Sequence, residues 1–473
     1  MSDSRPNIVL ILTDQQRGDC IGLDGHPALQ TPNIDWLGRS GTFFRRAYSE
    51  CPSCIPARRV LMSGQAPAVN GMVAMRGGVP FDPPNTLAGE LTRAGYQTEM
   101  IGKIHLWPHR KRFGFERMQR ADATRGADND YVTWLRQHGW NDMVDPGMAH
   151  GLSPNGWVGR PHHLPEELMH SFWCTSRALE FVERRDPTSP FFLNVSFIDP
   201  HPPLTPPAFY YDRYINRELP EPVIGDWAEV CEPERGLDPN AQHIRLDPDQ
   251  MRCARAGYYG MINFVDDQIG RLIQGLRDLG ELNNTFFLFT SDHGEMLGDH
   301  NLFRKTYPYE GSARVPFVAK ASPSMGLPSR VECNRPIGWQ DVMPTLLDVA
   351  GVQVPESVTG RSVLPFMRGD DTAEWRDVLH GEDAGTYGPE YAMQYLTDGR
   401  WKYVWHSQSG REQLFDLDTD PSELHDLALD SGADAELRPW RERLVQELRS
   451  RPEGFVREDD LAIGAKCSHL VPR

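Results

Sequence analysis

The chain has 473 residues, of which 39% are hydrophobic and 10% aromatic, and its formal net charge at pH 7 is −17. This length predicts one large domain and a smaller one, with enough apolar residues for packed cores. The acidic excess excludes general binding to nucleic acid or to an anionic membrane, because both require a basic surface. A small anionic substrate remains compatible with a locally positive site.

The first apolar run, IVLIL at 8–12, predicts a buried parallel strand. It is too short to span a membrane and lacks the flanking regions of a signal peptide. We therefore expect a cytoplasmic protein whose eight cysteines do not form a disulfide framework. The final LVPR, at 470–473, resembles a protease-site remnant and is assigned to neither domain.

Apolar, β-rich runs alternate with helical periodicity along the first 320 residues. The predicted strands are 7–12, 96–102, 191–198, 285–292 and 315–320, and the predicted helices are 86–95, 167–185 and 258–280. This alternation predicts an α/β fold in which helices cover both faces of a mostly parallel sheet. Sites in such sheets form at the carboxyl ends of the strands. The stretch 110–164 has no clear period and predicts long excursions that shape a pocket.

The character of the sequence changes after about residue 370. Short runs at 400–406 and 412–420 predict antiparallel strands, and 436–450 predicts an amphipathic helix. We therefore divide the chain into a large α/β domain at 1–369 and a smaller C-terminal α+β domain at 370–469.

Polar pairs follow two of the predicted strands at their carboxyl ends. Asp14 and Gln15 come after the first strand, and Asp292 and His293 come at the end of the strand at 285–292. Two such pairs at neighbouring strand ends can share one divalent cation. An aspartate at either place alone is as readily the cap of a turn. A second Asp-His pair at 299–300 makes the assignment ambiguous by spacing alone.

Four cationic or titratable side chains also lie near predicted strand ends. Lys103 and His105 stand two apart and share one face of a strand, His201 follows a third strand, and Lys305 lies after the Asp292 strand. Each alone is more commonly a solvated lysine or a structural histidine. Their shared location favours a site for an anion, because such groups are costly to bury without one.

The stretch CPSCIPARR, at 51–59, contains two cysteines three positions apart. A zinc site needs a second ligand pair, and the other six cysteines are scattered singly. A redox pair accounts for the helix that follows but leaves Arg58 and the strand-end ligands without a role. Cys54, which opens the predicted helix, is well placed to become a nucleophile that faces an anion.

These residues carry a resemblance to the sulfatase family. CIPARRVLMSG resembles its Cys-x-Pro-Ser/Ala-Arg signature, whose cysteine is oxidised to formylglycine after translation. Further segments match in the same order, and they are TPNIDWLGRSGTFFRRAYSE, GKIHL, FFLNVSFIDPHPPLTPP, FVDDQIGRL, TSDHGEMLGDH, DVMPTLLDVAGVQVP and LFDLDTDPSELHDLA. The resemblance implies the alkaline-phosphatase-like α/β fold with a small C-terminal antiparallel sheet, over nearly the whole chain.

The resemblance also implies a role for each candidate residue. The implied metal ligands are Asp14, Gln15, Asp292 and His293 together with Cys54, so the first Asp-His pair is preferred. Calcium is the ion expected from the family, and a nitrogen ligand also suits manganese. The implied catalytic and substrate-binding residues are Arg58 on the formylglycine hydrate, Lys103 and Lys305 on sulfate oxygens, His105 in release of the covalent intermediate, and His201 as general acid.

The chain departs from the family pattern after the signature. Asn70 stands where histidine is usual and Met75 where an active-site asparagine is usual, which removes one contact to a substrate oxygen. The neighbouring Arg76 is a candidate to supply that contact. The Asp-Gln and Asp-His ligand pairs resemble the branch that contains phosphonate monoester hydrolases and choline-sulfatase-like enzymes.

The function implied is hydrolysis of sulfate monoesters, of aryl or sugar type, through a formylglycine hydrate and one divalent metal. A phosphonate monoester or phosphate diester hydrolase with the same residues is the alternative, and a non-catalytic binding protein is a third. A formylglycine-generating enzyme is the implied transient partner. The C-terminal segment 455–470 is long enough to be an arm exchanged in a homo-oligomer, although nothing in the sequence requires one.

Overall fold

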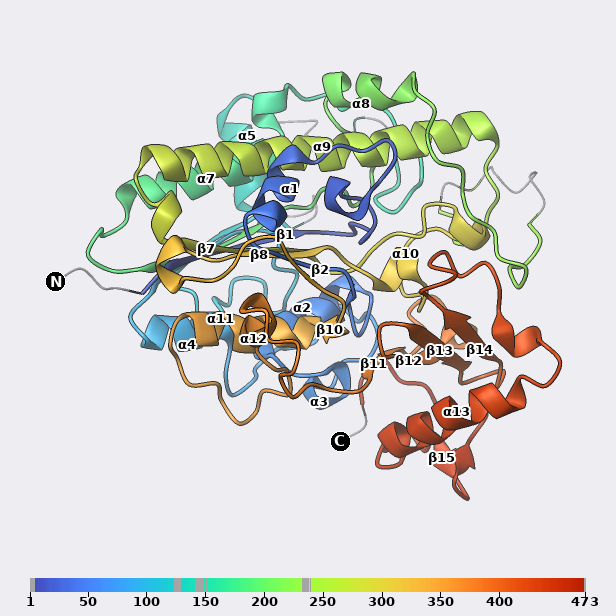
Figure 1. Ribbon diagram of the computed structural model, residues 1–473. Helices are drawn as coiled ribbons and strands as arrows, with labels where there is room; N and C mark the ends of the chain where they lie inside the picture. The colour runs from blue at the N-terminus through green and yellow to red at the C-terminus, as the bar shows by residue number, and fades with distance from the viewer. Residues whose placement is uncertain are drawn as a thin grey trace.

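The computed structural model describes residues 5–122, 129–140, 149, 151–231, 238 and 240–471. A large layered α/β unit and a smaller antiparallel sheet lie side by side in it (Figure 1). Among the described residues, the central sheet has eight strands in the order β5-β4-β6-β1-β7-β8-β2-β9. Their bounds are β5 (Arg117–Arg120), β4 (Gln97–Gly102), β6 (Phe191–Ser196), β1 (Asn7–Thr13), β7 (Thr285–Ser291), β8 (Phe317–Lys320), β2 (Thr42–Phe44) and β9 (Val331–Cys333).

The sheet is mostly parallel, which confirms the predicted fold class. Strands β5, β4, β6, β1 and β7 all run in one direction. Only β8 runs against both of its neighbours, β7 and β2, and β9 is again parallel to β2. Every strand predicted for this domain is present, with ends that differ by at most a few residues.

Helices cover both faces of the sheet because β1 sends alternate side chains into two cores. Ile8, Leu10 and Leu12 face one core, and Val9 and Ile11 face the other. The first core is closed by α2 (Cys54–Ser63), α4 (Leu87–Arg93), α11 (Val342–Val349) and α12 (Leu364–Met367). The second is closed by α1 (Pro32–Arg39), α5 (Asp130–Gln137), α7 (His170–Arg184) and α9 (Pro248–Asp278), as Figure 1 shows.

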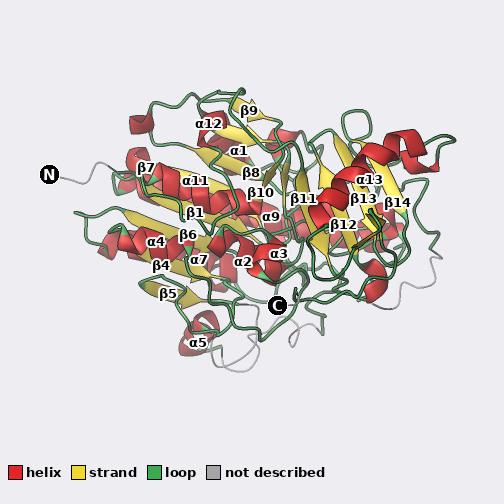
Figure 2. Ribbon diagram, turned by 90° about the horizontal axis from the view of Figure 1, so that it is seen from below, coloured by secondary structure: helices red, strands yellow, loops and turns green. Residues whose placement is uncertain are grey.

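The C-terminal part forms its own antiparallel sheet, as predicted. Its strands are β11 (Leu379–Asp383), β12 (Met393–Thr397), β13 (Trp401–His406) and β14 (Glu412–Asp416). Helix α13 (Asp434–Leu448) packs on this sheet through a small core of its own, and Figure 2 shows the helix lying across the strands. The predicted domain boundary at 369/370 falls between α12 and β11 and stays a prediction.

The remaining strands and α-helices of the described residues are short. They are β3 (Ala47–Tyr48), β10 (Ile337–Gly338), β15 (Val456–Arg457), β16 (Asp460–Leu461), α3 (Pro67–Asn70), α8 (Ala208–Ile215) and α10 (Glu310–Ala313). The described C-terminal residues pack on their own chain, where Leu470 forms a β-bridge with Met72. Among the helices of the described residues, none has the length and apolar character needed to cross a membrane.

Candidate active site

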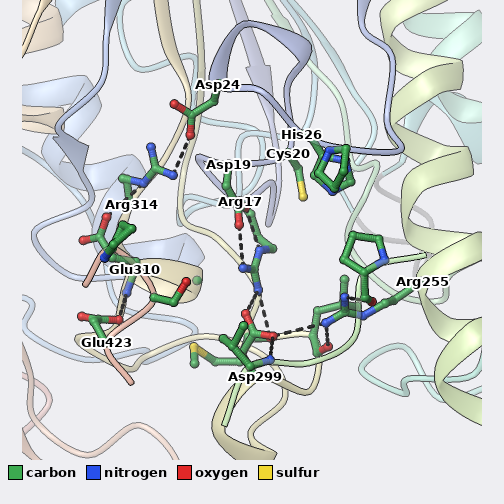
Figure 3. A pocket seen from close by; sticks show the side chains of 18 of the residues that line it. Arg17, Asp19, Cys20, Asp24, His26, Arg255, Asp299, Glu310, Arg314 and Glu423 are labelled. Carbon is green, nitrogen blue, oxygen red and sulfur yellow. Dashed lines mark hydrogen bonds and ion pairs between the residues drawn. The ribbon is translucent and has the colours of Figure 1, made fainter. Parts of the chain in front are cut away.

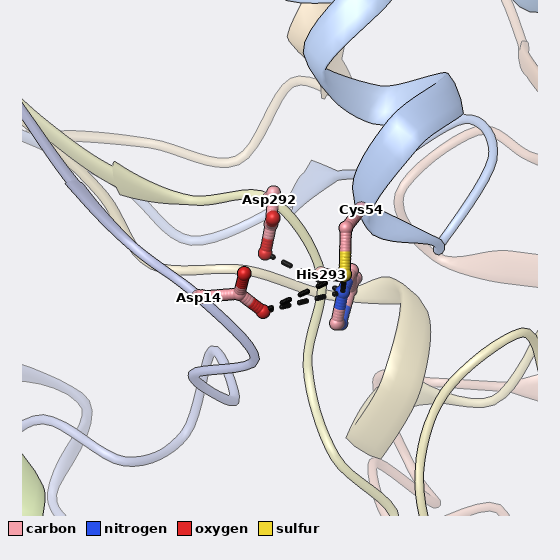
Figure 4. A group of neighbouring side chains, drawn as sticks. All are labelled: Asp14, Cys54, Asp292 and His293. Carbon is pink, nitrogen blue, oxygen red and sulfur yellow. Dashed lines mark hydrogen bonds and ion pairs between the residues drawn. The ribbon is translucent and has the colours of Figure 1, made fainter. Parts of the chain in front are cut away.

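Four of the predicted metal ligands lie together in one buried cluster (Figure 4). One ligand atom from each of Asp14, Cys54, Asp292 and His293 lies within 4.8 Å of all the others. Nε2 of His293 is 3.7 Å from Asp14 Oδ1 and 3.5 Å from Asp292 Oδ1. None of the four side chains is more than 1% exposed.

The sheet register explains why residues nearly 280 positions apart meet. β1 and β7 are neighbouring parallel strands in which Thr13 pairs with Ser291, so Asp14 and Asp292 are the next residue on each strand. The backbone N–H of Gln15 donates to Asp292 Oδ1 at 3.1 Å and joins the two strand ends. Gln15 has a φ of 71°, an uncommon conformation for a residue with a side chain, and such strain concentrates at functional sites.

Cys54 enters the cluster from the opposite side, at the first residue of α2 (Figure 4). Its Sγ lies 3.1 Å from His293 Nε2, 3.7 Å from Asp14 Oδ1 and 3.1 Å from Lys305 Nζ. Burial opposes ionisation of this thiol, but Lys103 and Lys305 outweigh burial and hold its pKa well below the usual value. The site therefore favours an anionic group at position 54.

Cys51 lies in different surroundings. Its Sγ approaches Asp383 Oδ2 at 4.0 Å, and burial beside this and other carboxyl groups raises the pKa of the thiol well above its usual value. Both cysteines are free thiols in the structure. The two sulfurs therefore do not form a redox or ligand pair, and only Cys54 joins the cluster.

Arg58 lies one turn along α2 and is 2% exposed. Its Nε donates to Asp292 Oδ2 at 3.0 Å, and its Nη1 donates to the carbonyl of Lys103 at 2.6 Å and to Ser196 Oγ at 2.9 Å. Nη2 is buried without a hydrogen-bond partner among the described residues, although it lies 3.5 Å from Asp14 Oδ2. An unsatisfied buried guanidinium donor beside the cluster suits a bound anion.

The predicted lysines and His201 face the cluster as well. Lys103 Nζ donates to Asp14, and Lys305 Nζ contacts three acceptors, namely Gln15 Oε1 at 2.8 Å, His201 Nε2 at 3.0 Å and Cys54 Sγ at 3.1 Å. His201 Nδ1 lies 2.7 Å from the carbonyl of Pro202, so this nitrogen carries the proton and Nε2 accepts from Lys305. Burial and Lys305 lower the pKa of His201.

The last two candidate residues, His105 and Arg76, lie in different surroundings. The backbone of His105 has a φ of 56°, its N–H donates to Asp122 Oδ1 at 2.9 Å, and its Nδ1 is buried without a hydrogen-bond partner among the described residues. Its side chain also helps to lower the pKa of Cys54 through a hydrogen bond. Arg76 is exposed, whereas the other candidates are mostly buried. The structure therefore does not bring Arg76 into the cluster, and its contact with substrate stays a prediction.

The second Asp-His pair has different partners. Asp299 accepts ion pairs from Arg17 at 2.7 Å and from Arg255 at 3.2 Å. His300 Nδ1 accepts from the backbone N–H of Gly225 at 3.0 Å, and its ring lies 4.5 Å from that of Trp227. These contacts hold loops together and lie outside the ligand cluster, and the assignment of the metal to the first pair stays a prediction.

His300 gives a prediction about acid stability. Burial lowers its pKa to about 4, despite the nearby Asp299, from an ordinary 6.5. His300 binds a proton less readily in the folded state than in the unfolded state. The free energy of unfolding is therefore not reduced by His300 above pH 6.5, and it falls as the pH drops toward 4. We expect His300→Gln, whose amide oxygen can still accept from Gly225, to remove up to about 3 kcal/mol of this loss. Urea unfolding between pH 7 and 4.5 measures the free energy of unfolding of wild type and of the variant. If that free energy changed equally with pH in both proteins, the prediction would be contradicted.

Sequence reasoning missed Glu295. This side chain is 3% exposed and its Oε2 accepts a hydrogen bond from Nε2 of Gln15. Its only signal in the sequence is its place two residues after His293, in the segment DHGE. A glutamate there is indistinguishable from a solvated loop residue until the fold brings β1 and β7 together.

The donor set fits one divalent metal ion. Two carboxylates, an imidazole nitrogen and an amide oxygen suit calcium or manganese. His293 Nδ1 lies 2.9 Å from the carbonyl of Gly294, which places the proton on Nδ1 and leaves Nε2 free to coordinate. Burial and the adjacent Asp14 raise the pKa of Asp292. The cluster can therefore hold a metal.

The fold and the site together define the class of protein. A mostly parallel sheet with a buried ligand cluster at its carboxyl edge, faced by arginine and lysine, assigns the chain to the alkaline phosphatase superfamily. The chain belongs to the sulfatase family within it, because the Sulfatase family model matches residues 6–352. A second model, N-sulphoglucosamine sulphohydrolase C-terminal, matches residues 298–450. The predicted family and fold are thereby confirmed.

Individual relatives cover nearly all of the chain. It is 40% identical to an arylsulfatase of Clostridium perfringens over 98% of this chain and 99% of that protein. It is 31% identical to the multifunctional alkaline phosphatase superfamily protein PehA of Trinickia caryophylli, over 96% and 99%. Among solved structures, the phosphonate monoester hydrolase of Agrobacterium radiobacter aligns with a TM-score of 0.78 at 26% identity, over 94% and 96% of the two chains.

Proposed function

We propose that this sulfatase hydrolyses sulfate monoesters of aryl or sugar alcohols, with a formylglycine derived from Cys54 and one divalent metal ion. The observation that carries the proposal is the position of Cys54, which opens α2 in contact with a buried carboxylate, imidazole and ammonium. The 40% identity to an arylsulfatase supports a sulfate ester as the substrate. A formylglycine-generating enzyme would act transiently on Cys54 before the fold closes over it, since Cys54 is 1% exposed.

The metal would be held by Asp14, Gln15, Asp292, His293 and the oxidised side chain at position 54. When bound, it would lower the pKa of an oxygen nucleophile and neutralise charge on the ester. Calcium is the expected ion, and the imidazole nitrogen of His293 also suits manganese.

The chain's own cations would bind and orient the anionic ester. Lys103 and Lys305 approach the cluster from two sides, and both would neutralise charge that develops on the sulfate oxygens. The unsatisfied Nη2 of Arg58 would fix the side chain at position 54 in a reactive orientation.

Two histidines remain for proton transfer. His201 is the candidate acid at the leaving-group oxygen, and its Nε2 faces the cluster beside Lys305 Nζ. His105, which has an unsatisfied Nδ1, would take a proton from position 54 when the covalent intermediate is released.

A mass measurement and a substrate comparison test this proposal. The tryptic peptide that contains Cys54 is expected to be about 18 Da lighter after the enzyme is produced together with a formylglycine-generating enzyme. The same preparation should hydrolyse 4-nitrophenyl sulfate and lose activity on chelation. An unmodified Cys54 in protein that is fully active on the sulfate would overturn the role of formylglycine.

A phosphonate monoester hydrolase is the second candidate. It is favoured by the structural similarity to the enzyme of Agrobacterium radiobacter, with a TM-score of 0.78. Sulfate and phosphonate monoesters share a compact anionic head, so the same lysines would serve both. A higher kcat/KM for a phenyl phosphonate ester than for the aryl sulfate would make this the principal activity.

A further inference from the structure

We propose that Glu295 is a positioning residue, which sets the amide of Gln15 so that its oxygen rather than its nitrogen faces the metal position. The inference rests on the metal assignment of the proposed function and adds to it a residue that is not itself a ligand. Both side chains are buried, with Gln15 1% exposed and Glu295 3% exposed.

The two partners of the Gln15 amide leave only one orientation. Nε2 donates to Glu295 Oε2, and Oε1 accepts from Lys305 Nζ at 2.8 Å. A carboxylate can only accept hydrogen bonds and an ammonium can only donate them. Rotation of the amide by 180° would set donor against donor at Lys305 and acceptor against acceptor at Glu295. The hydrogen-bond network therefore fixes the assignment of oxygen and nitrogen.

This orientation matters because only the amide oxygen coordinates a hard cation such as calcium. Lys305 Nζ, the partner of Gln15 Oε1, is also 3.1 Å from Cys54 Sγ, so the oxygen lies on the cluster side of the amide. The nitrogen points the other way, toward Glu295. Without an acceptor at position 295, Lys305 alone would hold the amide oxygen of Gln15 toward the cluster.

Glu295 is itself held in place. Its other oxygen, Oε1, accepts from the backbone N–H groups of Leu297, at 3.0 Å, and Arg304. Its own N–H donates to the carbonyl of Gly311 at 2.8 Å. The carboxylate therefore cannot turn to follow a rearranged amide.

Arg17 links the loop that contains Gln15 to the loop that contains Glu295. It donates to the carbonyl of Glu295 at 3.2 Å and pairs with Asp299 at 2.7 Å, and Figure 3 shows it between Asp19 and Asp299. None of the predicted metal ligands lines the pocket of Figure 3. We infer that the ion pairs of Arg17 help to hold Gln15 and Glu295 in position, because they fix the distance between the two loops.

Exchanging the two side-chain types tests the inference. In Glu295→Gln the remaining oxygen stays with the two backbone N–H groups, so an NH₂ group faces the nitrogen of Gln15. The amide of Gln15 then has a donor–donor contact in either orientation, at position 295 or at Lys305, and its oxygen is no longer held toward the cluster. In the double variant Gln15→Glu/Glu295→Gln, the amide nitrogen at position 295 donates to the carboxylate at position 15. The other oxygen of that carboxylate again faces Lys305 and the metal position. Asp266→Asn is the matched control, since Asp266 is a buried carboxylate that accepts from the backbone N–H groups of Asn33 and Ile34.

Metal affinity is measured by calorimetry with Ca²⁺ and with Mn²⁺ on chelator-treated protein, with thermal melting alongside. We expect Glu295→Gln to weaken binding about 10- to 100-fold, the double variant to bind more tightly than Glu295→Gln, and the control to bind within a few-fold of wild type. Equal affinity of Glu295→Gln and wild type would overturn the inference. A double variant that neither binds nor melts better than Glu295→Gln would overturn it too.

These outcomes separate the inference from the proposed function. If the wild-type protein bound neither ion, the metal assignment would fail, and recovery of the melting temperature in the double variant would still test the contact between positions 15 and 295. If wild type and Glu295→Gln bound the metal ion equally well, the metal assignment would be supported and the positioning role of Glu295 would be wrong.

Discussion

Cys54→Ala is expected to abolish sulfate ester hydrolysis, with a fall in kcat/KM of at least about 10⁴-fold. Alanine cannot be converted to formylglycine and offers no nucleophile, whereas the lysines and the other four proposed metal ligands would remain in place. Steady-state assays with 4-nitrophenyl sulfate measure the loss, and metal titration checks that the rest of the site is intact. Activity within a few-fold of wild type would show that the nucleophile lies elsewhere.

Cys51→Ala is the matched control, because the two cysteines stand three residues apart and are both buried. The Cys51 thiol faces Asp383 and none of the predicted ligands, so its removal takes away one small packing contact. We expect a small loss of stability, and kcat/KM within a few-fold of wild type. An equal loss of activity in both variants would mean that the two sulfurs act together after all.

The fold was largely predictable from the sequence because its central strands are buried on both faces. Such strands appear as unbroken apolar runs, and Asn7–Thr13 and Thr285–Ser291 match the predicted runs closely. The strand Arg117–Arg120 was missed inside the stretch predicted to be excursions, because it lies at the edge of the sheet and consists of polar residues and one methionine. Periodicity cannot identify an edge strand whose side chains need not be buried.

Helix α9 shows a second limit of periodicity. The predicted helix begins at residue 258, but the structure begins it at Pro248, after Asp247, whose side chain accepts from the N–H groups of Asp249 and Gln250. The Asp-Pro start is a signal of a helix N-terminus that the apolar pattern alone does not contain. Capping residues therefore mark this end better than hydrophobicity does.

The residues of the site were predictable from the sequence only where they directly follow a predicted strand. Asp14 and Asp292 follow recognisable strands, and the parallel register then forces them together. The roles of Arg58 and His105 came from the resemblance to sulfatases rather than from spacing. Glu295 could not be found either way, because its function depends on the donor and acceptor directions of one amide, which exist only in three dimensions.

Lys305→Met is expected to lower kcat by about 10²- to 10³-fold, the effect of removing one donor that stabilises charge in the transition state. Lys305 Nζ is shared by Gln15, Cys54 and His201, so methionine removes an ammonium that contacts a proposed ligand, the nucleophile position and the candidate acid at once. Burial opposes the charge on Lys305, but Cys54 and the two aspartates outweigh it and raise its pKa, so the ammonium persists across the working pH range.

Lys402→Met separates this catalytic effect from the general consequence of losing a buried lysine. Lys402 is 0% exposed, like the 3% exposed Lys305, but it pairs with Glu310 at 2.7 Å and Glu423 at 2.9 Å between the large unit and the C-terminal sheet. Its removal takes the cation away from the buried Glu423, while Glu310 keeps Arg314 at 3.0 Å, and it destabilises the fold by about 3–5 kcal/mol. We expect a lower melting temperature with unchanged kcat per folded molecule. Because a merely structural lysine at 305 would behave in the same way, a stability loss without a fall in kcat for Lys305→Met would remove Lys305 from the mechanism.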